Sequence, residues 1–214
     1  MLIKVCGMRE AQNIREVEAL GIDWMGFIFY PKSGRYCDRV PEYLPERCKR
    51  VGVFVDAEVS DIVKHVVEYG LQVVQLHGSE DRLYVMQLRQ ALGAIDRVCT
   101  IVKAFRVASP DDFRPCEPLV GFVDYFLFDT PTAGFGGSGR QFDWSLLSHY
   151  RCMTPFLLSG GIGPDSREAL SRLEHPCLEG IDLNSRFETA PGLKDVTALR
   201  EFLEGNSTIL TIKN

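Results

Sequence analysis

Residues 124–144 read DYFLFDTPTAGFGGSGRQFDW, and this stretch carries the pattern that decides the fold. Its apolar run, 125–128, predicts a buried strand that ends at a lone carboxylate, Asp129. A loop follows that contains four glycines, Gly134, Gly136, Gly137 and Gly139. Asp143 is a suitable cap for a helix after that loop. A strand, a loop and a helix in this order make one βα unit.

The glycine-rich loop has two interpretations. Its backbone amides, free of side chains, suit a phosphate group. Glycines also mark ordinary loops, in which case Asp129 only caps a turn.

The same alternation of strand and helix runs outward through the rest of the chain. We expect strands at 2–6, 22–30, 50–55, 71–76, 98–105, 125–128, 156–158 and 180–183. Helices are expected between them, including a short one at 41–48 and one opened by Pro164. In the helix after Ser79 we expect Leu83, Met86 and Leu92 to face inward.

Eight such units in 214 residues predict an α/β fold, a single-domain (β/α)8 TIM barrel over 1–214. The alternative is an open doubly wound sheet. Its GxGxxG turn is missing after the first strand, where Cys6, Gly7 and Met8 stand instead. The closed barrel is therefore the favoured fold.

Composition excludes several classes of partner. The formal charge is −5 and no block of lysine and arginine occurs, so a nucleic-acid partner is not expected. The first residues turn polar too soon for a signal peptide, and no apolar run reaches membrane-spanning length. The sequence predicts a soluble, cytoplasmic protein with no membrane partner.

Neither a disulfide framework nor a metal site is expected. The seven cysteines are scattered without a CxxC pair, and the four histidines show no i, i+4 pairing. Most of the cysteines are expected to be small buried apolar residues.

A barrel of this kind gathers the carboxyl ends of its strands on one rim, where the active site forms. The strand ends supply the candidates Cys6, Arg35, Asp56, His77, Lys103 or Arg106, Asp129, 159–161 and 184–186. The loops after strands seven and eight commonly bind phosphate, which makes Gly160 and Gly161 phosphate-binding candidates.

Cys6 is either a packing residue or a thiol facing the pocket, and Gly7 favours the second by letting the chain turn at the rim. Lys4 shares the parity of Cys6, so if Cys6 faces inward, Lys4 is expected to face inward one layer deeper. Its ammonium would then favour the thiolate, or else form a structural ion pair inside the barrel.

The other candidates also keep two interpretations each. The planar guanidinium of Arg35 suits a substrate carboxylate, but it could be a solvated loop charge. His77 is expected to line the pocket. Asp56 and Lys103 are either structural or functional, and Arg186 is either a phosphate contact or a surface charge.

An ordered set of motifs then resembles one family along nearly the whole chain. These motifs are 4–8 (KVCGM), 26–29 (GFIF), 33–36 (SGRY), 51–54 (VGVF), 75–78 (QLHG), 128–130 (FDT), 136–139 (GGSG) and 159–162 (SGGI). Together they resemble phosphoribosylanthranilate isomerase of tryptophan biosynthesis. In that family a small-residue Ser-Gly pattern often follows strand eight, whereas this chain has Asn184, Ser185, Arg186 and Phe187.

The resemblance implies an Amadori rearrangement of N-(5-phosphoribosyl)anthranilate, the third step of tryptophan synthesis from chorismate. It implies Cys6 as general base, Asp129 as general acid and Arg35 on the anthranilate carboxylate, with no cofactor. The remaining substrate-binding candidates are His77, Gly137, Gly139, Gly160, Gly161, Asn184 and Ser185. The expected partner is a small phosphorylated substrate, and the chain is expected to be a monomer or a homodimer.

Overall fold

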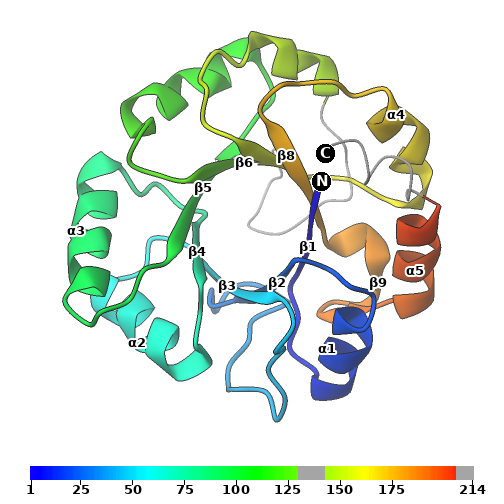
Figure 1. Ribbon diagram of the computed structural model, residues 1–214, viewed down its shortest axis with the longest axis horizontal. Coiled ribbons are helices and arrows are strands. Elements are labelled where there is room, and N and C mark those ends of the chain that lie inside the picture. The colour runs from blue at the N-terminus through cyan, green and yellow to red at the C-terminus, as the bar shows by residue number, and fades with distance from the viewer. Residues whose placement is uncertain (130–142, 206–214) are drawn as a thin grey trace.

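Eight parallel strands close into a barrel in the computed structural model, which describes residues 1–129 and 143–205 (Figure 1). Each strand pairs with the next one along the chain, and the last pairs with the first. The predicted closed barrel is therefore confirmed. The strands are β1 (Leu2–Cys6), β2 (Trp24–Ile28), β3 (Lys49–Phe54), β4 (Val73–Leu76), β5 (Thr100–Arg106), β6 (Tyr125–Asp129), β7 (Phe156–Leu158) and β8 (Leu178–Leu183).

Helical segments surround the barrel on its outside (Figure 1). The α-helices are α1 (Ala11–Glu18), α2 (Val59–Tyr69), α3 (Arg82–Gly93), α4 (Arg167–Ser171) and α5 (Val196–Glu204). Shorter 3-10 segments are η1 (Pro110–Leu119), η2 (Trp144–His149), η3 (Pro164–Ser166) and η4 (Ser185–Phe187). Within the described ranges, no helix is long and apolar enough to cross a membrane.

The sheet has two apolar faces, as parallel sheets covered by helices usually do. Inside the barrel, Val51, Val73, Val102, Leu127 and Leu157 belong to one buried cluster. A second and larger cluster lies between the sheet and the helices. Because both faces are buried, the strands read as continuous apolar runs, and this is the signal that revealed them in the sequence.

The helix expected at 41–48 does not form. Pro45 lies in the middle of this stretch, where it removes a backbone donor and disfavours helical geometry at the residue before it. The segment is held instead by buried Glu18, whose carboxylate accepts a hydrogen bond from the Glu46 backbone nitrogen at 2.6 Å.

The prediction of which residues of α3 face inward is also partly wrong. Leu92 is buried, but Leu83 and Met86 are 60% and 46% exposed, while Val85 and Leu88 are fully buried. Apolar residues lie on more than one side of this helix, so spacing alone did not determine which side meets the sheet.

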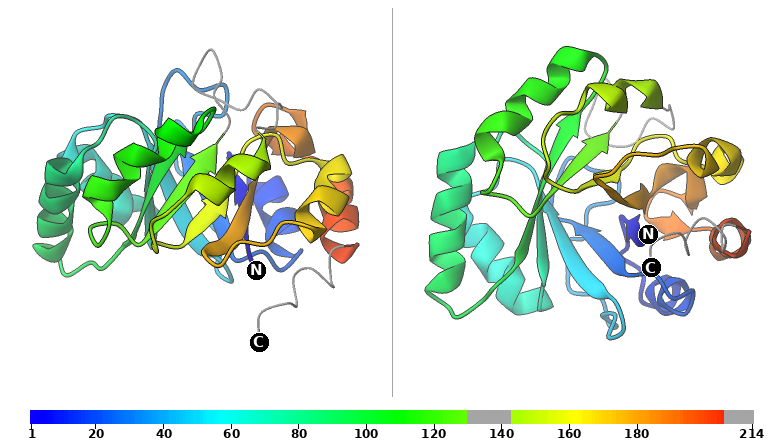
Figure 2. Two further views of the ribbon diagram at one scale, coloured as in Figure 1. Left: turned by 90° about the horizontal axis from the view of Figure 1, so that it is seen from above. Right: turned by 45° about the horizontal axis from the view of Figure 1, so that its top comes forward.

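A two-stranded antiparallel hairpin extends the chain after β8. It consists of β9 (Glu188–Ala190) and β10 (Leu193–Lys194). Figure 2 shows the loop after β2 and the segment after β8 at the same end of the barrel, away from the N-terminus. Segments that are far apart in the sequence thus meet at the carboxyl rim.

The closure between β8 and β1 requires a very close approach of the two backbones. Gly180 pairs with Leu2 in this register, and a Cβ atom at position 180 would collide with the carbonyl oxygen of Leu2. Only glycine fits here without moving one of the strands.

We predict that Gly180→Ala lowers the free energy of unfolding by ~1–3 kcal/mol, because the added methyl group meets backbone rather than a movable side chain. Urea unfolding would measure the loss. Gly93→Ala is the matched control, since nothing lies within 4 Å of its added Cβ, and it should change stability by no more than about 0.5 kcal/mol. Equal stability of the two variants would contradict this account of barrel closure.

Candidate active site

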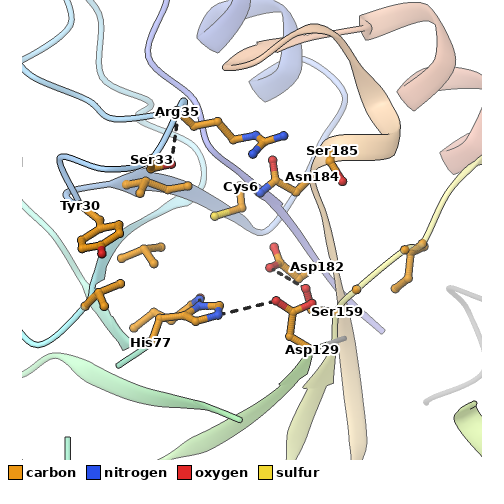
Figure 3. A pocket seen from close by; sticks show the side chains of 17 residues that line it. Cys6, Tyr30, Ser33, Arg35, His77, Asp129, Ser159, Asp182, Asn184 and Ser185 are labelled. Carbon is orange, nitrogen blue, oxygen red and sulfur yellow. Dashed lines mark hydrogen bonds and ion pairs between the residues drawn. The ribbon is translucent and has the colours of Figure 1, made fainter. Parts of the chain in front are cut away.

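A pocket opens at the carboxyl ends of the strands (Figure 3). Nine of the residues predicted from the sequence line it: Cys6, Arg35, His77, Asp129, Ser159, Gly160, Gly161, Asn184 and Ser185. Gln75 and Asp182 line it as well. Residues from at least six strands or the loops after them therefore share one cavity, as a barrel rim requires.

The thiol of Cys6 lies at the end of β1 and faces this pocket. Cys6 pairs with Gly26 of β2, and a Cβ at position 26 would lie 2.7 Å from the sulfur, so glycine there makes room for the thiol. Gly7 follows with a φ of +82°, a conformation that favours glycine. A Cβ at Gly7 would also lie 2.8 Å from Cδ of Arg35, so this turn lets the arginine side chain pass close over the backbone.

Lys4 and Asp182 form an ion pair inside the barrel, beneath Cys6. Lys4 Nζ donates to Asp182 Oδ1 at 2.8 Å, and both residues are buried. Burial lowers the pKa of Lys4, but the charges of Asp182 and Cys6 outweigh this effect and raise it. Lys4 therefore forms the structural ion pair, and its charge also lowers the pKa of Cys6.

Burial raises the pKa of the Cys6 thiol, and the negative charge of Asp182 adds to the rise. The ammonium groups of Lys4 and Lys194 act in the opposite direction. Each positive charge moves the thiol toward the thiolate form that a base requires.

Asp129 ends β6 and lies beside His77, with 3.6 Å between Oδ2 of the carboxylate and Nε2 of the ring. Gln75 Nε2 is 3.0 Å from the other ring nitrogen, Nδ1. When the amide donates to Nδ1, the neutral ring carries its proton on Nε2, which faces Asp129. Gln75 thus orients the histidine against the carboxyl group.

Gly160 and Gly161 follow β7 with φ angles of +82° and +71°. They line the pocket together with Asn184 and Ser185, which follow β8. Arg186 instead holds Asp165, with Nη2 at 2.8 Å from both carboxylate oxygens. This pair joins the loop after β7 to the loop after β8.

Two further candidates have structural partners. Lys103 Nζ lies 3.0 Å from Oε2 of buried Glu80, and Asp56 accepts from the backbone nitrogen of Ser79 at 2.6 Å. Neither lines the pocket. The sequence-based candidates Gly137 and Gly139 lie outside the described residues.

Four residues near the site were not predicted from the sequence: Gln75, Asp182, Glu188 and Lys194. Asp182 interrupts an apolar strand, and an acidic residue in such a run is a signal that could have identified it. Glu188 and Lys194 lie in a hairpin of two very short strands, where no sequence pattern exists to find them. Among the described residues, no group of three or more His, Cys, Asp or Glu could hold a metal ion.

The closed barrel has a pocket at the carboxyl ends of its strands, where a thiol, a carboxyl group and a guanidinium converge. This arrangement is typical of a (β/α)8-barrel enzyme. Comparison with known proteins then gives the family. The family model for N-(5'-phosphoribosyl)anthranilate isomerase matches residues 3–205. The chain belongs to this family and is an isomerase.

Similar proteins cover nearly the whole chain. The N-(5'-phosphoribosyl)anthranilate isomerase of Phocaeicola vulgatus is 49% identical over 204 residues, which is 95% of this chain and 96% of the relative. The crystal structure of the Thermotoga maritima isomerase has a TM-score of 0.79 at 31% identity, covering 97% of this chain and 98% of that one. A further isomerase structure, in complex with reduced 1-(o-carboxyphenylamino)-1-deoxyribulose 5-phosphate, has a TM-score of 0.76 at 28% identity and covers 95% and 97% of the two chains.

We predict that the double variant Lys4→Met/Asp182→Asn has a higher Cys6 pKa than the wild type. Lys4 lowers this pKa more than Asp182 raises it, so removing both charges leaves a net rise. The ultraviolet absorbance of the thiolate would be measured as a function of pH. For each protein, the absorbance of the same protein carrying Cys6→Ser is subtracted, so that the difference reports the pKa of Cys6.

The single variant Lys4→Met is a second test with the same sign, because it removes the charge that lowers the Cys6 pKa. Its titration should also move to higher pH. A double variant that titrates at or below the wild-type pH would contradict the assigned electrostatics.

Proposed function

We propose that this chain catalyses the Amadori rearrangement of N-(5-phosphoribosyl)anthranilate to 1-(2-carboxyphenylamino)-1-deoxyribulose 5-phosphate, with Asp129 as general acid and Cys6 as general base. This is the third step of tryptophan synthesis from chorismate. The observation that carries the proposal is that β1 and β6 bring this thiol and this carboxyl group into one pocket. Two groups on separate strands can act on two atoms of one sugar.

In the first step the protonated carboxyl group of Asp129 donates its proton to the ring oxygen of the ribose. The C1–O bond breaks, the nitrogen lone pair forms a C=N bond, and the ring opens to an iminium ion. His77 contacts the same carboxylate, and its Nε2–H orients Asp129 toward the sugar.

In the second step the Cys6 thiolate removes the proton from C2. The electron pair of that C–H bond moves toward the positively charged iminium nitrogen, giving an enolamine that tautomerises to the aminoketose. Because the substrate nitrogen accepts the electrons, the reaction needs no cofactor. The ammonium of Lys4 supports this step by stabilising the thiolate before the proton is removed.

Substrate binding follows from the two ends of the pocket. Arg35 presents a guanidinium suited to the anthranilate carboxylate. Gly160, Gly161 and Ser185 provide open backbone for the 5-phosphate. Asn184 lies beside Arg35 and is proposed as a further substrate contact. The proposal also includes Gly137 and Gly139 as phosphate-side contacts.

The relatives support a phosphorylated ligand that also carries a carboxylate. The assembly state of this chain is part of the proposal. A solved relative holds the reduced aminoketose phosphate, which carries both a carboxylate and a phosphate. The Thermotoga maritima isomerase is described as dimeric. We include in the proposal a cytoplasmic protein that acts as a monomer or a homodimer.

Cys6→Ala and Asp129→Ala should each lower kcat by at least about a hundredfold, the usual minimum contribution of a general acid or base. Affinity for the reduced aminoketose phosphate should remain within about threefold of wild type, because neither group is needed to hold the ligand. Steady-state kinetics and calorimetry would measure the two quantities. Near-normal turnover in both variants would refute the assigned roles.

A tryptophan auxotroph that lacks only this isomerisation step should grow without tryptophan when it expresses the wild-type chain. The Cys6→Ala protein, expressed at the same level, is the control and should not support growth. If well-expressed wild-type protein did not support growth, the result would favour a different phosphosugar reaction on the same fold. Stabilisation by phosphorylated ligands with no product would favour a binding protein without catalysis.

A further inference from the structure

A cluster of three charged side chains lies at the mouth of the pocket: Arg35, Glu188 and Lys194, here called the Arg35 cluster. Arg35 Nε lies 2.9 and 3.0 Å from the two carboxylate oxygens of Glu188, and Arg35 Nη2 lies 2.7 Å from Oε2. Lys194 Nζ forms an ion pair with the other oxygen, Oε1. One carboxylate is therefore shared by two cations.

The hairpin that carries Glu188 and Lys194 is fixed to the barrel. Asn13 of α1 bonds to the Lys194 backbone in both directions, donating from Nδ2 at 2.9 Å and accepting at Oδ1 at 2.8 Å. The backbone nitrogen of Gly192 donates to Glu188 Oε1 at 3.1 Å. Glu188 is thus held in place before any ligand arrives, and it can impose an orientation on Arg35.

The Arg35 cluster is buried enough for its charges to matter. The side chains of Glu188 and Lys194 are 5% and 0% exposed, and that of Arg35 is 12% exposed. Burial raises the pKa of Glu188, but hydrogen bonds from Arg35 and the charge of Lys194 outweigh it, so the pKa is lowered. Glu188 is therefore a carboxylate at neutral pH. Burial lowers the pKa of Lys194, and the charge of Glu188 acts in the opposite direction. When Lys194 is protonated, the cluster carries one net positive charge.

The guanidinium has a second edge. Among the described residues, the side-chain hydrogen bonds of Arg35 use Nε and Nη2 on one edge only. A planar fork held on that edge still offers Nη1 and the second Nη2 hydrogen, which suit a second carboxylate. Figure 3 shows the Arg35 side chain reaching across the mouth toward Asn184, and the residue lines the pocket.

We propose that Glu188 is a positioning residue, which holds one edge of Arg35 so that the other edge meets the substrate carboxylate. Lys194 has the complementary role. Without it, Arg35 and Glu188 would sum to zero charge and would attract an anion weakly. With it, the cluster keeps a net charge of +1 that matches one carboxylate.

This inference rests on the proposed function, because it requires a substrate carboxylate at Arg35. It adds that recognition depends on a residue that never touches the substrate. An arginine fixed in advance loses less conformational freedom when the ligand binds, so the hairpin contributes affinity through orientation.

The test is calorimetry with two probes: the reduced aminoketose phosphate, and the same molecule without the aromatic carboxylate. Glu188→Gln should weaken binding of the carboxylate probe by up to about tenfold, the usual cost of ordering one flexible side chain when the ligand binds. Binding of the second probe should stay within about twofold. In kinetics, KM should rise while kcat changes little.

Glu188→Gln leaves buried Lys194 without its carboxylate and could impair folding. Glu188→Gln/Lys194→Met removes both charges, keeps a net charge of +1 on the cluster and leaves no unpaired ammonium. The same selective loss for the carboxylate probe is expected, since orientation is lost while charge is kept. Glu168→Gln is the matched control, because Glu168 pairs with Arg172 on the exposed surface, and it should bind both probes like wild type.

An Arg35→Met background completes the design. There, adding Glu188→Gln should change neither probe further, because the residue acts only through Arg35. The proposal is overturned if Glu188→Gln and the double variant keep the wild-type preference for the carboxylate probe, or if they lose both probes equally. Failure of the proposed function is separate: the wild-type protein would then show no isomerase turnover, whatever the calorimetry gives.

Discussion

The ion pair between Lys4 and Asp182 is the contact on which the site depends. It joins the first and last strands where the barrel closes, and the two residues are direct partners in the β1–β8 register. Because it is buried, either charge alone would be costly, and Asp182 raises the pKa of Lys4. The charge of the same lysine lowers the pKa of Cys6, so one residue contributes both to barrel closure and to the electrostatics of the thiol.

The Arg35 cluster at the pocket mouth has a similar arrangement, in which a buried carboxylate pairs with cations. Glu188 stands between Lys194 and Arg35 as Asp182 stands beside Lys4, and Lys194 also acts on Cys6. In these two groups, the three cations Lys4, Lys194 and Arg35 outnumber the two carboxylates Asp182 and Glu188 by one, next to a site proposed to bind a substrate with a carboxylate and a phosphate. Each carboxylate in these pairs fixes the position of a cation, and the surplus remains available to the ligand.

The sequence predicted the barrel and most pocket residues because both depend on local patterns. Buried parallel strands appear in the sequence as apolar runs, and the carboxyl ends of these strands meet at one rim of the barrel. The sequence therefore predicted that Cys6, His77 and Asp129, which lie at strand ends, share one site. Asp182 carried a sequence signal as an acidic residue in an apolar strand, but its partner Lys4 lies 178 residues away in the chain and could not be assigned. Glu188 carried no such signal, and its partner Arg35 lies 153 residues away. The expected helix at 41–48 does not form because Pro45 interrupts it, and buried Glu18, which the sequence analysis did not single out, holds the segment instead.

The central claim is that the thiol of Cys6 and the carboxyl group of Asp129, on strands far apart in the sequence, act on two atoms of one sugar. A crystal structure of this chain with the reduced aminoketose phosphate tests it most directly. The account predicts the Cys6 sulfur next to C2 of the sugar, and the Asp129 carboxyl group next to the hydroxyl derived from the ring oxygen. A ligand bound with either group on the far side of the sugar chain from its assigned atom would contradict it.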